Sequence, residues 1–435
     1  MDLLQNVLRG FFGLAVLLGI CYLFSENRKA INWQLVGMGI LLQLILAVGV
    51  LHIDFVRSIF EVLARGFVRI LDVSKAGTDF VFGKFADTSQ SWGFVFAIQV
   101  SCNIIFFSAI SALLYYLGIL QKVVFGFAWI MNKTLKLSGA ESVSNAANIF
   151  LGQTEAPLMV RPYLSGMTRS ELLCIMVGGM ANTAGSVLGA YVSFLGGTDV
   201  ALKEYYALHM LTQSIMSAPA AVVAAKILLP QVEEDKVQKD MSVPKENIGS
   251  NVLDAIANGT TDGLKLAANV IAMLISFIAL IAVLNYLMLK IGNLVHINTV
   301  IQQMSGGHYE GFSLKFIFGY LFAPLAWVIG VPATDVLSLG QLLGEKTIIN
   351  EFYAYGTLGG MMSKNEILDP KSILIATYAL CGFANFASIG IQIGGIGALA
   401  PNQRHTLSEL GMKSLIGGTI ACLMNACIAG MLFSK

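Results

Sequence analysis

The sequence predicts an all-α polytopic membrane protein. Of its 435 residues 56% are hydrophobic and only 12% are charged, whereas a soluble domain carries about 25% charged residues. The hydrophobic residues gather in long segments, and a helix needs about 20 such residues to cross a bilayer. Because helices satisfy their own backbone hydrogen bonds in lipid, we expect about eight transmembrane helices, with two re-entrant hairpins and interfacial helices beside them.

The overall charge gives no sign of a strongly charged partner. The formal net charge is +1 at pH 7, so we expect no nucleic acid among the partners.

The six cysteines all lie in apolar segments without a CxxC pair, and we interpret them as small buried side chains. The sequence has no HExxH motif and no Cys/His cluster. We therefore expect no enzyme, although a catalytic pair of glutamates needs no such motif.

The first 53 residues predict two scaffold spans. Leu3 to Phe24 contains Arg9 and no small-residue cleavage site, so we interpret it as a retained span rather than a signal peptide. Trp33 to Ile53 is the second span. From Asp54 onward, charged residues recur every three or four positions among apolar ones, which predicts an amphipathic helix lying in the membrane interface.

A carboxylate lies in apolar surroundings in the stretch Asn148 to Pro157, which reads N-I-F-L-G-Q-T-E-A-P. The apolar residues on each side of Gly152 and Glu155 are too few for a span, so we expect two half-helices that form a re-entrant hairpin. An ionisable group at membrane depth is by default a hypothesis for a functional site.

The remaining segments follow a repeated order. The spans, hairpins and helices expected in them are a span within Ser91 to Leu120, a short helix over Val123 to Leu137, a span over Leu172 to Gly197 broken at Asn182 to Ser186, a span over Tyr205 to Leu229, a charged linker over 231–250, a weaker amphipathic helix around Asp254 to Lys265, a span over Leu266 to Leu289, a polar loop over Gly292 to Gly311, a short helix over Phe316 to Val331, a second hairpin around Glu351, a broken span over Ser372 to Leu399, and a last span over Ser414 to Phe433.

The two halves also match in their residues. G-M-A-N-T-A at 179–184 matches G-F-A-N-F-A at 382–387, and Glu155 matches Glu351. We therefore expect two repeats, 54–230 and 251–435, after the scaffold spans of 1–53. Lysines and arginines favour the cytoplasmic side, which puts both termini outside and the repeats in opposite directions. Inverted repeats with two broken helices are typical of secondary transporters.

The expected hairpins and broken spans place polar side chains at one level of the membrane. These residues are Gln153, Thr154, Glu155, Asn182, Ser186, Glu351, Asn385 and Ser388. A dicarboxylate or phosphate would call for arginine there, so a neutral polyhydroxy or amide-bearing solute fits better. Phe383 and Phe386 are suited to cover a planar ring. The alternative is that the Asn and Ser residues only hold helices together.

Several motifs resemble those of bacterial concentrative nucleoside transporters. They are N-I-F-L-G-Q-T-E-A-P at 148–157, G-V-P at 330–332, N-E-F at 350–352 and F-A-N-F-A-S-I-G at 383–390. The resemblance implies that Gln153 and Thr154 bind the nucleobase, with Glu155 nearby and Val187 packed against it. It implies that Glu351, Asn385 and Ser388 hold the ribose hydroxyls, with Phe383 alongside. It further implies a homotrimer in the lipid bilayer of the bacterial inner membrane.

The resemblance also implies a coupling ion. Family members use sodium or protons, and the matching sodium position consists of Asn148, the Leu151 carbonyl, Asn182 and Thr183. Neutral oxygens of this kind suit a hard cation. Some proton-coupled relatives lack the hairpin Asn, so Asn148 favours sodium, whereas Asn182 replaces a smaller hydroxyl residue. We expect symport of a uridine-like nucleoside with sodium and no other cofactor. The alternatives are proton coupling, another neutral solute such as a nucleobase, or a passive channel.

Overall fold

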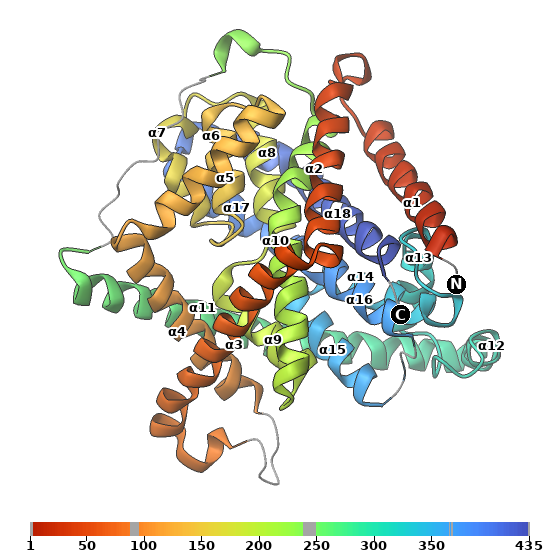
Figure 1. The fold of residues 1–435 in the computed structure, drawn as a ribbon. Helices are drawn as coiled ribbons and strands as arrows, with labels where there is room; N and C mark the ends of the chain where they lie inside the picture. The colour runs from red at the N-terminus through yellow and green to blue at the C-terminus, as the bar shows by residue number, and fades with distance from the viewer. Residues whose placement is uncertain (1–2, 88–94, 238–248, 365, 367–368, 434–435) are drawn as a thin grey trace.

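The computed structural model describes residues 3–87, 95–237, 249–364, 366 and 369–433. These residues form α-helices and short 3-10 helices, with no β-strand among them (Figure 1). The predicted all-α fold is therefore confirmed. Part of the expected 231–250 linker and the start of the expected span from Ser91 lie outside the described residues.

The N-terminal part follows the predicted helices closely. Helix α1 (Leu3–Leu23) leads through η1 (Arg28–Ala30) to α2 (Trp33–His52). Ile53 is in an extended conformation and separates α2 from α3 (Asp54–Phe82), the expected amphipathic helix. Helix α3 is followed by η2 (Gly83–Ala86). On the charged side of α3, Arg57 and Glu61 lie one turn apart, and the Nε atom of Arg57 is 2.8 Å from the Oε1 atom of Glu61.

The next part contains both predicted interruptions of the first half. The helices are α4 (Phe96–Tyr116), α5 (Ile119–Leu135), α6 (Gly139–Ala147), η3 (Ala156–Val160), α7 (Arg161–Leu164), α8 (Arg169–Ala181), α9 (Gly185–Gly196) and α10 (Val200–Leu228). The chain is irregular between Asn148 and Glu155, and again at 182–184, between α8 and α9. Both irregular stretches lie where Gly, Pro and Asn residues predict them.

The second half differs from the prediction in two places. Its helices are η4 (Glu234–Lys236), α11 (Val252–Leu294), α12 (Ile297–Met304), α13 (Leu314–Val328), η5 (Ala333–Asp335), α14 (Val336–Ile348), α15 (Glu351–Ser363), α16 (Pro370–Leu380), α17 (Phe386–Leu399), η6 (Pro401–Gln403) and α18 (Arg404–Met431). The expected interfacial helix and the following span are one continuous helix, α11, of 43 residues. No proline interrupts it, and its polar N-terminal part continues the same turns. The expected polar loop from Gly292 contains the short helix α12.

Helices α8, α10, α16 and α18 form the centre of the molecule (Figure 1). Most residues of α10 are buried. Corresponding helices of the two halves make corresponding contacts: α5 packs on α6 as α13 packs on α14, and α8 packs on α18 as α16 packs on α10. Helix α11 runs across the molecule and packs on α4. Gly259 and Gly263 permit this approach, because a Cβ atom at Gly263 would lie 2.8 Å from the Cα atom of Ile105.

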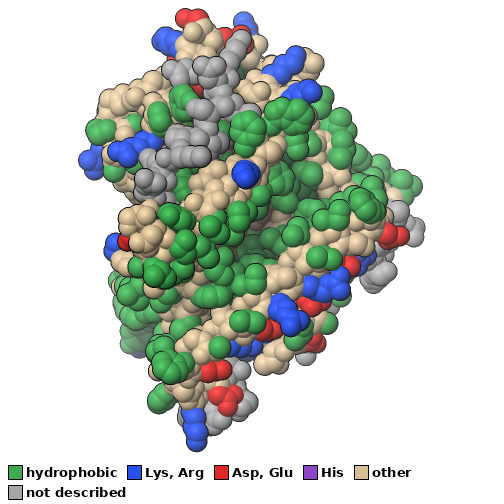
Figure 2. All heavy atoms as spheres, turned by 60° about the vertical axis from the view of Figure 1, so that its left-hand side comes forward, with side chains coloured by type: hydrophobic (Ala, Val, Ile, Leu, Met, Phe, Trp, Pro, Cys, Tyr) green, Lys and Arg blue, Asp and Glu red, His purple; other side chains and the backbone are tan. Residues whose placement is uncertain are grey.

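The surface suits a lipid environment. Seven helical segments of the described residues are long and apolar enough to cross a membrane. The segment expected as a span over Ser372 to Leu399 is divided between α16 and α17, so neither part reaches that length. Figure 2 shows hydrophobic side chains across the middle of one face, with charged side chains mostly at its upper end and in a diagonal row below. Exposed apolar residues at these positions indicate contact with lipid or with another subunit.

Candidate functional site

The two helix breaks lie against each other in the centre of the molecule. The backbone N–H of Phe383 donates to the carbonyl oxygen of Asn182 at 3.2 Å. Gln213, on α10, donates from Nε2 to the carbonyl oxygens of Cys381 at 2.5 Å and Ala181 at 3.4 Å. The Sγ atom of Cys422, on α18, lies 3.5 Å from each of the same two oxygens. The last carbonyl of α8 and the carbonyl of Cys381, the residue after α16, are thus held together by one residue from each half.

The first hairpin is anchored to the break between α8 and α9. Helix α6 begins with a capping box of Ser138 and Glu141 and ends at Ala147. The irregular chain that follows is fixed by its own groups, since the N–H of Gly152 donates to the Glu155 carboxylate at 3.2 Å. It is also fixed to the break, since the N–H of Gly185 donates to the carbonyl of Phe150 at 3.1 Å.

The second hairpin positions Glu351 at the start of a helix. Asn350 caps α15 by accepting a hydrogen bond from the N–H of Tyr353 at 2.9 Å. The Glu351 carboxylate is 3% exposed and accepts from Tyr191 Oη at 3.1 Å and from Asn385 Nδ2 at 3.0 Å. Asn385 also caps α17, accepting from the N–H of Ser388. One amide therefore links the second hairpin to the second helix break.

A further hydrogen bond connects the first hairpin to α17. Gln153 donates from Nε2 to Ser388 Oγ at 3.0 Å, so the residue expected at the base end touches a residue expected at the ribose end. Thr154 packs on α17, where a Cβ atom at Gly395 would lie 2.8 Å from its Cγ2 atom. Val187 is buried on α9, and Phe383 is partly buried between the two breaks.

Glu155 faces a cavity that the sequence does not predict. Glu155 is exposed, whereas the other predicted substrate residues are buried or half-buried. It lines a cavity of about 170 Å³ between the first hairpin, α4 and α11. Other polar groups in the lining are Ser108, Ser111, Tyr115, Ser186 and Asp262. Ser186 is one of the residues predicted at this level of the membrane. In the sequence, Asp262 stands out only as one of the polar residues that recur every three or four positions in the expected weaker amphipathic helix.

The predicted sodium residues lie at the ends of α6 and α8. Asn148 follows α6 and Asn182 follows α8, and each is 1% exposed. Neither the Nδ2 nor the Oδ1 atom of either side chain has a hydrogen-bond partner among the described residues. Leu151 and Thr183 are buried in the same two irregular stretches. Buried amides are normally satisfied, so these side chains and the nearby helix-end carbonyls fit a small cation.

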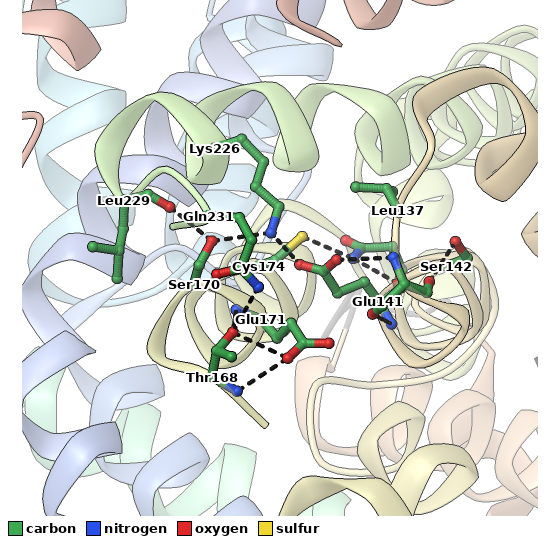
Figure 3. A network of polar contacts seen from close by, with 12 residues as sticks. Leu137, Glu141, Ser142, Thr168, Ser170, Glu171, Cys174, Lys226, Leu229 and Gln231 are labelled. Atoms are coloured by element: carbon green, nitrogen blue, oxygen red, sulfur yellow. Dashed lines mark hydrogen bonds and ion pairs between the residues drawn. The ribbon is translucent and has the colours of Figure 1, made fainter. Parts of the chain in front are cut away.

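A second polar cluster ties the first hairpin to α8 and α10 (Figure 3). The ammonium group of Lys226 makes an ion pair with Glu141 and donates to Ser170 Oγ at 3.0 Å. Thr168 and Glu171 form the capping box of α8, and Gln231 donates to Thr168 Oγ1 at 2.9 Å. Both members of the ion pair are buried. The sequence did not predict this cluster, because the residues that form it are far apart in the chain. For the same reason it did not predict the roles of Tyr191 and Gln213, whose partners are also distant in the chain.

Comparisons with known proteins agree with this geometry. Residues 12–85 match the N-terminal part of the Na⁺-dependent nucleoside transporter family, residues 209–430 match its C-terminal part, and residues 97–198 match the nucleoside recognition "Gate" family. An uncharacterized transporter of Haemophilus influenzae is 41% identical, with 98% of each chain covered. Sodium/nucleoside cotransporter 1 of Rattus norvegicus is 37% identical, over 97% of this chain. The chain spans 63% of that longer relative.

Solved structures give the same result. The structure of CNTnw in an inward-facing substrate-bound state is 37% identical, has a TM-score of 0.86 and covers 98% of both chains. A variant of CNTnw in an outward-facing state has a TM-score of 0.85, with 98% of this chain and 97% of that chain covered. These relatives are transporters rather than enzymes. The chain therefore belongs to the concentrative family of Na⁺-dependent nucleoside transporters.

Proposed function

We propose that this chain is a sodium-coupled symporter that carries uridine-like nucleosides into the cell by alternating access. The single observation that carries the substrate assignment is the Glu351 carboxylate, held by Tyr191 and Asn385 beside the Gln153–Ser388 hydrogen bond. A fixed carboxylate accepts charge-assisted hydrogen bonds from a ribose diol. Gln153 and Thr154 supply amide and hydroxyl groups for the base, and Val187 and Phe383 supply apolar contact. Glu155 opens onto the cavity through which the substrate passes.

The proposal of sodium as the coupling ion rests on the two unpartnered amides. Asn148 and Asn182 offer neutral oxygens at two helix ends, where the backbone carbonyls carry partial negative charge. The carbonyl of Leu151 and the hydroxyl of Thr183 complete the proposed set. Each sodium ion driven inward contributes about 2.3 kcal/mol per 100 mV of membrane potential. The solved inward-facing and outward-facing relatives support alternating access.

The proposed assembly is a homotrimer in the bacterial inner membrane, with both termini outside. Helix α11 supports an oligomer, because many large apolar side chains along it are exposed, Ile275, Leu280 and Tyr286 among them. The proposed units are the scaffold spans of 1–53 and two inverted repeats, 54–230 and 251–435, joined by the linker 231–250. The corresponding helix contacts of the two halves support this division.

Uptake of radiolabelled uridine into proteoliposomes tests the function. We expect uptake to rise with an inward sodium gradient and to accumulate uridine against its own gradient, which excludes a passive channel. Uptake that follows a pH gradient and ignores sodium would assign the coupling to protons. Competition by adenine or ribose as strong as by uridine would assign another neutral solute.

A further inference from the structure

A row of polar side chains leads along α6 away from the proposed sodium residues. Glu141, Asn145 and Asn148 are spaced by four and three residues, which places them on one face of this helix. On the adjacent helix α8, Cys174 and Gly178 are also one turn apart. The Nδ2 atom of Asn145 donates to the Glu141 carbonyl oxygen at 3.0 Å and to Cys174 Sγ at 3.4 Å. We call these five residues the polar seam between α6 and α8.

Gly178 allows two amides of the polar seam to meet. A Cβ atom at Gly178 would lie 2.3 Å from Asn145 Oδ1 and 3.2 Å from Asn148 Nδ2, so both side chains use the space that this glycine leaves. Asn145 is 0% exposed, and no group in the described part of the chain donates to its Oδ1 atom. Because a buried amide oxygen normally has a partner, Asn145 offers a neutral oxygen to a cation, one turn from Asn148.

The other end of the polar seam reaches a cavity of about 550 Å³. Glu141 and Lys226 both line this cavity, together with residues of the connection between α1 and α2 and of the chain that follows α10. The proposed topology, with both termini outside, places these connections on the cytoplasmic side. Seven residues separate Asn148 from Glu141, a distance of about 10 Å at a rise of about 1.5 Å per residue. A short polar route therefore joins the proposed sodium residues to the cytoplasmic face.

A buried cation lies at the cavity end of this route. The Lys226 ammonium pairs with the Glu141 carboxylate and donates to Ser170 Oγ at 3.0 Å (Figure 3). The Glu171 carboxylate also acts on its charge. A fixed ammonium group repels a sodium ion that enters from the cavity, whereas the Glu141 carboxylate attracts one that arrives along the polar seam.

We propose that the coupling sodium ion leaves for the cytoplasm along the polar seam. Asn145 receives the ion after Asn148, and the ion pair of Lys226 with Glu141 is the gate at the cavity. This inference rests on the proposed sodium coupling. An ion in the protein interior needs such oxygens, because a buried charge without partners is costly. Since Glu155 opens onto the separate cavity beside α4 and α11, ion and nucleoside leave through different openings.

A comparison of net uptake with exchange in proteoliposomes tests the proposal. Net sodium-driven uptake of uridine requires release of the ion in every cycle. Exchange of labelled for unlabelled uridine, with saturating sodium on both sides, does not. Asn145→Leu keeps the approximate size of the side chain and removes its oxygen. We expect the maximal rate of net uptake to fall roughly tenfold to hundredfold, the factor for one lost hydrogen bond to a charged group, and exchange to keep its wild-type rate.

Ser142→Ala is the matched control for this comparison. Ser142 is buried on α6 outside the polar seam, and its hydroxyl donates to the Ser138 carbonyl oxygen. Its loss should change neither rate. Equal losses of net uptake and exchange in Asn145→Leu would overturn the proposal, because they indicate a structural role, and so would an unchanged net uptake. Wild-type uptake that ignores a sodium gradient would instead refute the proposed sodium coupling.

A second measurement leaves Asn145 in place. Cys174 is a native thiol of the polar seam, and Ag⁺ is a monovalent cation, close to Na⁺ in size, that replaces the proton of a thiol. The measurement uses a variant that keeps Cys174 and has alanine at the other five cysteines. We expect Ag⁺ on the cytoplasmic side of membrane vesicles to inhibit uridine transport by this variant, and Cys174→Ala to remove the inhibition. Transport that Ag⁺ leaves unchanged in the variant with Cys174 would overturn the proposal.

Discussion

Glu351→Gln separates the charge of the proposed ribose site from its shape. The Glu351 carboxylate accepts hydrogen bonds from Tyr191 and Asn385. A glutamine can keep both, since its oxygen accepts from Asn385 and its amide donates to the tyrosine hydroxyl, which both donates and accepts. The local structure should survive, and the variant should lose only the charge-assisted bond to a ribose hydroxyl.

The size of the effect follows from that bond. A hydrogen bond to a charged group contributes roughly 1.5–3 kcal/mol, and each 1.4 kcal/mol is about a factor of ten. We therefore expect kcat/KM for uridine uptake to fall roughly tenfold to hundredfold. Deoxyuridine that lacks the hydroxyl should lose much less, because it forms no such bond in wild type.

The assay is uptake of uridine and of its 2′-deoxy and 3′-deoxy analogues into proteoliposomes. Glu345→Gln is the matched control: Glu345 is a buried glutamate of the same hairpin and bonds to Gln341 rather than to the site. It should leave the preference for uridine over the deoxy analogues unchanged. If Glu351→Gln also leaves that preference at the wild-type value, Glu351 does not bind the ribose.

Three further predictions follow from named contacts. Asn148→Ala should abolish the dependence of uridine uptake on sodium, which a sodium titration of initial rates measures. Lys226→Met should destabilise the protein by about 3–5 kcal/mol, because it leaves the buried Glu141 carboxylate unpaired. Thermal unfolding should show that the double variant Lys226→Met/Glu141→Gln recovers part of this stability. Equal stability of the single and double variants would contradict the role of the ion pair. Gly263→Ala should cost about 1–3 kcal/mol by forcing α11 away from α4, whereas Gly126→Ala, with nothing within 4 Å of the new Cβ atom, should not.

The sequence was sufficient to predict the helix breaks and to place Glu351 and Asn385 at one level of the membrane. Breaks are local events, signalled by Gly152, Pro157 and Asn182, and the internal repeat assigns the second set from the first. The continuity of α11 was not predictable from the same signals. A change from polar to apolar residues marks where a helix leaves the interface, but it does not end the helix, and no proline lies between Val252 and Leu266.

The residues that hold the site in place were not predictable in this way. Tyr191 is one aromatic residue in an apolar segment, and only the fold brings its hydroxyl to Glu351. Lys226 and Glu141 form their ion pair across helices α10 and α6. Pairs of this kind depend on how helices pack, and periodicity within one helix carries no information about the neighbour that it meets.

The hydrogen bonds of Gln213 to both breaks have a thermodynamic consequence. One side chain donates to the last carbonyl of α8 and to the first residue after α16, so a displacement of either oxygen changes the bond to the other. Substitutions near Ala181 and near Cys381 should therefore have non-additive effects on nucleoside affinity, and the interaction energy of the double-mutant cycle should vanish when Gln213 is replaced by leucine.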